Sequence, residues 1–249
     1  MLRHQGKNRA YSHNLKLASV LSCVAGIVNS VGVLGLHTLT TNVTGHFAFF
    51  AEEIVEENYN RGIVYLFYTF FFLLGSFVSS LIMEWVLKHK PEVSYVIPIL
   101  LEVLLLVGLS LVDIAFPNAL LKYSAFTALV LLFSMGVQNS LVTRVSSAVV
   151  RTTHLTGLFT DLGIVLSQLF FYKNRSERIR LFRSIFLMLA IISCFFIGCV
   201  AGGFLYLHFQ FKTLFLGAAL LLFALWYDQL LMSYYSLKRK IQKVEIFNR

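Results

Sequence analysis

The sequence predicts an all-α integral membrane protein with six transmembrane helices, arranged as two inverted three-helix repeats that each carry an additional partial helix. Three observations support this prediction: an apolar composition, an uneven distribution of basic residues, and a polar motif that occurs once in each half. Hydrophobic residues make up 57% of the 249 positions and charged residues 13%. Soluble domains average about 45–50% and about 25%, so the composition excludes a soluble globular domain.

Six stretches are long and apolar enough to cross a bilayer, which requires about 20 residues each. They span residues 17–37, 62–87, 94–114, 119–140, 184–208 and 212–232. No linker-like composition interrupts them, so we expect a single membrane domain over residues 1–249. Two shorter apolar stretches, 42–55 and 155–172, follow polar residues. We expect each of them to be re-entrant or to lie at the membrane surface.

The basic residues predict the orientation in the membrane. When the first segment is placed in the cytoplasm, only Arg61, Lys122 and Lys212 of the 21 Lys and Arg residues fall on the outer side. This positive-inside bias predicts that the tails, residues 1–16 and 233–249, are cytoplasmic, in a plasma membrane or a bacterial inner membrane. The net charge of +9 is then explained by topology and anionic lipid headgroups, so no nucleic-acid partner is expected.

A polar motif occurs in both halves, as TTNVTGHF at residues 40–47 and TTHLTGLF at residues 152–159. It is preceded by GIVNS and GVQNS, and it is followed later by GSFVSS and GCVAGG, whose small residues allow helices to approach closely. Repeat one (17–114) and repeat two (119–232) therefore share one order of features. Three crossings per repeat give the repeats opposite orientations, an arrangement typical of secondary transporters and some channels.

The chain resembles the YoaK-like family of bacterial multi-pass membrane proteins, which carries a domain of unknown function. The family patterns AGxxDxxGFL…TGN and GxQN…TT…TG…LG are matched by AGIVNSVGVLGL, NVTGH and GVQNSLVTRVSSAVVRTTHLTGLFTDLG. The resemblance covers nearly the whole chain and implies no established activity. Asn29 stands where the family usually has Asp, and His46 stands where it usually has Asn. If those groups bind a ligand in relatives, the resemblance implies a different specificity here.

The candidate substrate-binding residues are polar groups and glycines at matching places in the two halves. They are Asn29, Thr44, Gly45, His46, Asn139, Thr156 and Gly157. We expect the threonines to cap the partial helices and the glycines to admit a ligand or another backbone. Helix N-termini that point toward the midplane favour an anion. Two alternatives stay open: surface helices with ordinary caps, and asparagines that only join neighbouring helices.

Two acidic residues are candidates for proton coupling. Glu102 lies near the middle of the third span, where a carboxylate is costly and indicates function by default. A hydrogen-bonded structural carboxyl is the alternative for Glu102. Asp161 lies on the second partial helix, one turn beyond Gly157. The three cysteines lie in apolar runs without converging partners, so neither a metal site nor a cofactor is expected.

The sequence contains no nucleophile elbow, HExxH motif, P-loop or dinucleotide fingerprint, and we do not expect an enzyme. The favoured function is a secondary transporter or channel in the cell membrane. We expect it to bind a small solute, with an anion favoured, between the inverted repeats. The expected partners are the lipid bilayer and that solute, and the fold is compatible with a homo-oligomer. The alternative is a membrane sensor or scaffold without transport activity.

Overall fold

The computed structural model describes residues 11–89, 95–146 and 152–227, and within these ranges it is almost entirely helical, without a strand. This confirms the all-α class predicted from the sequence. The predicted tail 233–249 and most of the predicted tail 1–16 lie outside the described residues. The elements in chain order are α1 (Tyr11–Leu36), α2 (Val43–Val55), α3 (Tyr59–His89), α4 (Val96–Ala115), α5 (Ala119–Lys122), α6 (Ser124–Val145), α7 (Leu155–Phe171), α8 (Arg175–Phe209) and a 3-10 turn (Gln210–Thr213).

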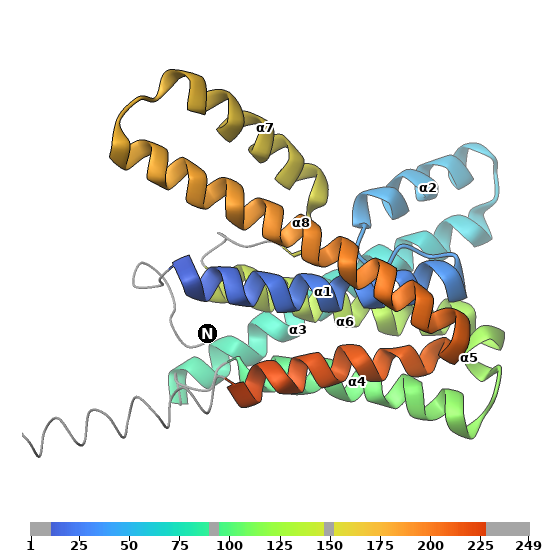
Figure 1. The fold of residues 1–249 in the computed structure, drawn as a ribbon. Coiled ribbons are helices and arrows are strands. Elements are labelled where there is room, and N and C mark those ends of the chain that lie inside the picture. Colours follow the sequence, from blue (N-terminus) through green and yellow to red (C-terminus); the bar gives the residue numbers. More distant parts are fainter. Residues whose placement is uncertain (1–10, 90–94, 147–151, 228–249) are drawn as a thin grey trace, which may run out of the picture.

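Five segments of the described residues are long and apolar enough to cross a membrane: Leu15–Leu36, Tyr59–Lys88, Val96–Ala115, Ser124–Val145 and Arg175–Tyr227. The last segment has 53 residues and contains a reversal of the chain. After α8 the 3-10 turn begins with Gln210 at a φ of 52°, and a helix over 214–227 then runs back along α4 (Figure 1). This segment therefore covers the predicted stretch 184–208 and the described part, 212–227, of the predicted stretch 212–232.

Three predicted boundaries differ from the observed helices, the first being that of 17–37, which begins at Tyr11 as α1. The stretch 119–140 is not continuous, because Tyr123 leaves the helical conformation between α5 and α6. The helix expected from residue 184 begins at Arg175 as α8. A hydropathy pattern detects only the apolar part of a helix, whereas arginine is a good helix former and extends α8 toward its N-terminus.

The helices α1 and α8 pack through two glycines whose backbones meet directly. A Cβ added to Gly26 would lie 2.2 Å from the Phe195 carbonyl oxygen, and one added to Gly198 would lie 2.1 Å from the Cys23 carbonyl oxygen. Any side chain at either position would collide with main-chain atoms of the partner helix. The predicted role of these small residues in close helix approach is confirmed.

The helices α3 and α6 make the same kind of contact. A Cβ added to Gly75 would lie 2.1 Å from the Phe133 carbonyl oxygen, and one added to Gly136 would lie 2.2 Å from the Phe72 carbonyl oxygen. The hydroxyl of Ser76 also donates to the carbonyl oxygen of Gly136 at 3.0 Å. Each tight pair thus joins one helix from the first half of the chain to one from the second half.

The centre of the bundle is formed by α1 and α6. Residues 17–32 of α1 and 127–142 of α6 show the same succession of buried and half-buried side chains along their length. Gln138 Nε2 donates across this contact to the Leu21 carbonyl oxygen at 2.7 Å. In the view of Figure 1, α2 and α7 lie on one side of this bundle, begin near the middle of its length and slope toward opposite ends.

Candidate functional site

The chain folds back into the bundle after α1. The Thr41 hydroxyl donates to Asn29 Oδ1 at 3.0 Å. Asn29 precedes the end of α1 at Leu36 by two turns, which is about 10 Å along the helix axis. Residues 40–45, hereafter the first polar turn, therefore lie beside α1 and not beyond its end.

The chain makes an equivalent contact between α6 and α7. The Thr153 hydroxyl donates to Asn139 Oδ1 at 3.1 Å. Asn139 lies about 9 Å along the axis from the end of α6 at Val145. Residues 152–157, hereafter the second polar turn, are thus held beside α6 in the way that the first polar turn is held beside α1. Both predicted asparagines hold a polar turn through a threonine hydroxyl.

Two threonines that the sequence reasoning did not single out are fully buried in these turns. Thr40 and Thr152 both have 0% exposure, and neither hydroxyl oxygen has a hydrogen-bond partner among the described residues. They precede Thr41 and Thr153 and occupy the same place in the two motifs. A buried hydroxyl that makes no hydrogen bond costs about 1–3 kcal/mol, which favours a bound polar molecule beside it. Their repetition in both motifs was the available sequence signal.

The expectation that Thr44 and Thr156 cap the partial helices is wrong. The N-cap of α2 is Asn42, whose Oδ1 accepts from the Gly45 backbone N–H at 3.0 Å. The N-cap of α7 is His154, without a side-chain capping bond. Asparagine is among the best N-cap residues, so α2 starts one residue before Thr44. Both threonines are instead exposed on the first helical turn.

The two glycines make room for the side chains of the N-cap residues, Asn42 and His154. A Cβ added to Gly45 would lie 3.2 Å from Asn42 Nδ2, and one added to Gly157 would lie 2.7 Å from the His154 ring carbon Cδ2. The structure therefore places a side chain of the same turn against each glycine, where the sequence predicted a ligand or a second backbone. Gly45 and Gly157 shape the polar turns from within.

His46 joins α2 to α3 and to the preceding loop. Its Nε2–H donates to the Leu39 carbonyl oxygen at 2.6 Å, and its ring meets the edge of Tyr68 at 5.3 Å between centroids. Burial lowers the pKa of His46, because the charged imidazolium is disfavoured away from water. Leu158, at the same motif position in the second half, is also buried. The residue at this motif position therefore packs the partial helix against the bundle, and His46 also binds the Leu39 carbonyl, next to the first polar turn.

Glu102 on α4 has 0% exposure, and neither of its carboxyl oxygens has a partner among the described residues. One turn further along α4, the side chain of Leu106 lies close to that of Val24 on α1. A Cβ added to Gly217 would approach both side chains within 3.7 Å. Other buried polar atoms without a described partner are the hydroxyls of Ser22, Ser79 and Ser134 and Oε1 of Gln138. The interior of the bundle is therefore polar as well as apolar.

Asp161 lies on the exposed side of α7, apart from Glu102. It lines a pocket of about 240 Å³ between α7 and α8, together with Ser184 and six apolar side chains. Glu102 is not among the residues that line this pocket. The two acidic candidates therefore belong to different parts of the structure.

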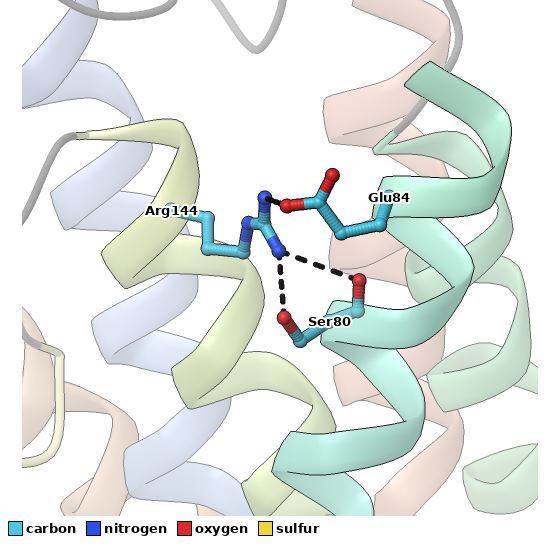
Figure 2. Close-up of polar contacts among 3 residues, drawn as sticks. All are labelled: Ser80, Glu84 and Arg144. Atoms are coloured by element: carbon cyan, nitrogen blue, oxygen red, sulfur yellow. Dashed lines mark hydrogen bonds and ion pairs between the residues drawn. The ribbon is translucent and has the colours of Figure 1, made fainter. Parts of the chain in front are cut away.

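A charged cluster joins the ends of α3 and α6, and sequence reasoning used its arginine, Arg144, only as a topology signal. Arg144 Nη1 donates to Ser80 Oγ at 2.6 Å, and Nη2 pairs with the Glu84 carboxylate (Figure 2). When Gly26 is matched with Gly136 and Gly75 with Gly198, the positions equivalent to these three residues are Leu34, Gly203 and Leu207. A Cβ added to Gly203 would lie 3.7 Å from Leu34 Cδ1. Near one end of the bundle the helices are thus joined by charged side chains, and at the equivalent positions near the other end the side chains are apolar.

Comparison with known proteins agrees with the motif resemblance. A family model described as "Protein of unknown function (DUF1275)" matches residues 17–227. No curated protein and no solved structure gives a significant match. Among the described residues, no group of three or more His, Cys, Asp and Glu side chains lies in position to hold a metal ion.

Proposed function

The chain belongs to the DUF1275 family of proteins of unknown function, and on that premise we propose that it is a secondary transporter or channel for a small solute. The observation that carries the proposal is the pair of polar turns, each held inside the bundle by an Asn–Thr hydrogen bond. Each turn also buries a threonine hydroxyl that has no partner among the residues that the structure describes. A solute with hydrogen-bond acceptors would satisfy the buried hydroxyl of the turn that it contacts.

We propose that the two halves, 17–114 and 119–232, are inverted repeats with three crossings each. The support is the repeated contact pattern: Gly26 and Gly136 touch the carbonyl oxygens of Phe195 and Phe72, which also occupy equivalent positions. The matching burial of α1 and α6 points the same way. An inverted repeat relates the two sides of the membrane, which is the symmetry that alternating access requires.

The depth of the turns supports a site between the repeats. The Gln138–Leu21 bond places these two residues at one level. The proposed repeat equivalence likewise pairs Val28 with Leu131, so the middle of the contact between α1 and α6 lies near Val24 and Ser134. Asn29 and Asn139 lie about 7 Å on either side of this level, as judged from the helical rise. The hydrocarbon half-thickness of a bilayer is about 15 Å. Both polar turns therefore reach hydrocarbon depth, where irregular backbone is tolerated only when it lines a cavity or is buried in protein.

An anion is the favoured solute. The first turns of α2 and α7 begin at the polar turns, and helix N-termini present free N–H groups and the positive end of the helix dipole. Threonine hydroxyls can donate to the same anion. Glu102, buried without a partner, supplies a group that could exchange a proton with the transport cycle. The alternative of a scaffold is less well supported, because a scaffold has no use for several unpartnered polar groups in its interior.

A thermal-shift screen of the purified protein tests this proposal. We expect small organic and inorganic anions to raise the melting temperature more than neutral or cationic solutes of similar size. Thr40→Val and Thr152→Val remove only the hydroxyls and should each weaken anion binding by about tenfold or more, the worth of a hydrogen bond to a charged group. Thr160→Val is the matched control, because its exposed hydroxyl already bonds to the Thr156 carbonyl oxygen. Unchanged anion binding in both valine variants would contradict the proposed site.

Reporter fusions test the proposed topology, with both termini cytoplasmic in the cell membrane. Fusions after residues 60, 118 and 210 should report the outer side, and fusions after residues 89 and 176 should report the cytoplasm. The charge bias of the sequence is the physical reason. A cytoplasmic signal at residue 60, or an outer signal at residue 176, would mean that a partial helix crosses the membrane and that the repeats are not inverted.

A further inference from the structure

An apolar pocket of about 820 Å³ lies between the end of α4 and the start of α6, on both sides of α5. Its lining includes the buried side chains of Leu109 and Leu120 and the exposed side chains of Val112, Phe116 and Phe126. Sites that bind small organic ligands usually measure about 300–1,000 Å³. The pocket is therefore large enough for an extended apolar chain.

The rim of the pocket has the features of a membrane interface. Phe116, Tyr123 and Phe126 are all more than half exposed, with 66%, 60% and 64% of their surface accessible. Of these three rings, that of Tyr123 is amphipathic, and tyrosine is enriched where a bilayer meets water. Lys122 also lines the pocket, and it is one of the few basic residues expected on the outer side. One pocket thus combines an apolar interior, an aromatic rim and a cation.

The charge of Lys122 is not neutralised by the protein around it. Among the described residues, the interaction of its Nζ is with the face of the Tyr123 ring, 5.6 Å from the centroid, and no carboxylate lies within ion-pair distance. Lys212, the other lysine at this end, differs because its charge acts on Asp113. Lys122 is therefore free to bind an external anion at the mouth of the pocket.

We propose that this pocket binds an anionic phospholipid of the outer leaflet, with an acyl chain between α4 and α6 and the phosphate at Lys122. The acyl chain matches the apolar lining and gains van der Waals contacts with Leu109 and Val112. The headgroup gains the electrostatic attraction of one lysine, worth about fivefold in relative binding near an anionic membrane surface. This inference is independent of the solute site between the polar turns.

Quenching by brominated lipids tests the site in the full-length protein. A tryptophan reporter, Phe126→Trp, is placed at the rim, and the two native tryptophans are replaced in the background variant Trp85→Phe/Trp226→Phe. The reporter protein is reconstituted in phosphatidylcholine vesicles with a minor fraction of brominated phosphatidylglycerol or brominated phosphatidylcholine. We expect the anionic lipid to bind near the reporter about fivefold better.

Two further variants separate a lipid site from general surface charge. Lys122→Ala should abolish the preference for phosphatidylglycerol, whereas the matched control Lys212→Ala should keep it. Ala119→Phe fills the pocket from its lining and should also abolish the preference while leaving the lysine in place. Equal quenching by the two lipids in the reporter protein overturns the proposal. So does a preference that survives Lys122→Ala, or one that survives Ala119→Phe.

Discussion

Alanine at Gly75 or at Gly198 is expected to separate a tightly packed helix pair and to lower the thermal stability of the protein strongly. The added Cβ would lie 2.1 Å from the carbonyl oxygen of Phe133 or of Cys23, respectively. These oxygens are main-chain atoms, so a clash is relieved only if α3 moves away from α6, or α1 from α8. Overpacking in a close-packed core costs about 1–3 kcal/mol, and we expect values at or above the upper end. Thermal unfolding of the purified variants in detergent measures the loss.

Gly108→Ala and Gly163→Ala are the matched controls. A Cβ at either position would meet nothing within 4 Å, and both glycines lie inside helices. Alanine is the better helix former by about 1 kcal/mol, so both controls should be neutral or slightly more stable than the native protein. If Gly75→Ala unfolds at the same temperature as Gly108→Ala, the α3–α6 contact described above is wrong.

These glycines also show how far the sequence predicts the fold. Small residues four apart in GSFVSS and GCVAGG predict that a helix backbone is approached closely, and the structure confirms it. The identity of the approaching helix is not contained in that spacing. Gly75 contacts α6 and Gly198 contacts α1, so each of these glycines packs against a helix from the other half of the chain. A spacing rule describes one helix face, whereas a partner depends on how all the helices fill the bundle.

The polar turns show the same limit at the candidate site. The repeated motif singled out Asn29 and Asn139, and these residues accept the hydrogen bonds that hold the two turns. The motif did not show that Thr41 rather than Thr44 would face Asn29. That outcome depends on the chain turning back along α1, a tertiary feature that helix propensities do not encode. For Thr44 the capping expectation failed for a local reason, because Asn42 precedes it and is the stronger cap.

The cluster of Arg144, Ser80 and Glu84 near the C-terminal end of α6 could not be foreseen from charge counting. Arg144 contributes to the positive-inside bias in the same way as any other basic residue of its loop. Its pairing with Glu84 and Ser80 depends on α3 lying parallel to α6 at the right register. A pair between side chains that are 29% and 57% exposed stabilises the fold little. The pair links α3 to α6 through charged groups near one end of the bundle. At the equivalent positions near the other end, Leu34 packs against Gly203.

Glu102→Met is expected to stabilise the protein and, in the proposed transporter, to remove the dependence of solute binding on pH. The Glu102 side chain has 0% exposure, and neither oxygen has a described partner. A buried polar group in that position costs about 1–3 kcal/mol, and methionine has a similar shape without the polar atoms. For a chain of this size, that gain corresponds to an increase of roughly 2–10 °C in melting temperature.

Glu102→Gln separates the two effects, because it keeps the polarity and the shape but cannot exchange a proton. Its stability should stay near that of the native protein, and anion binding measured by thermal shift should become independent of pH, as in Glu102→Met. Glu52→Met, at an exposed position of α2, is the control and should change neither property. A clear loss of stability in Glu102→Met would show that the carboxyl group is a structural partner in the folded protein. In that case the buried carboxyl is retained for the fold, and the proton-coupling role proposed for it is wrong.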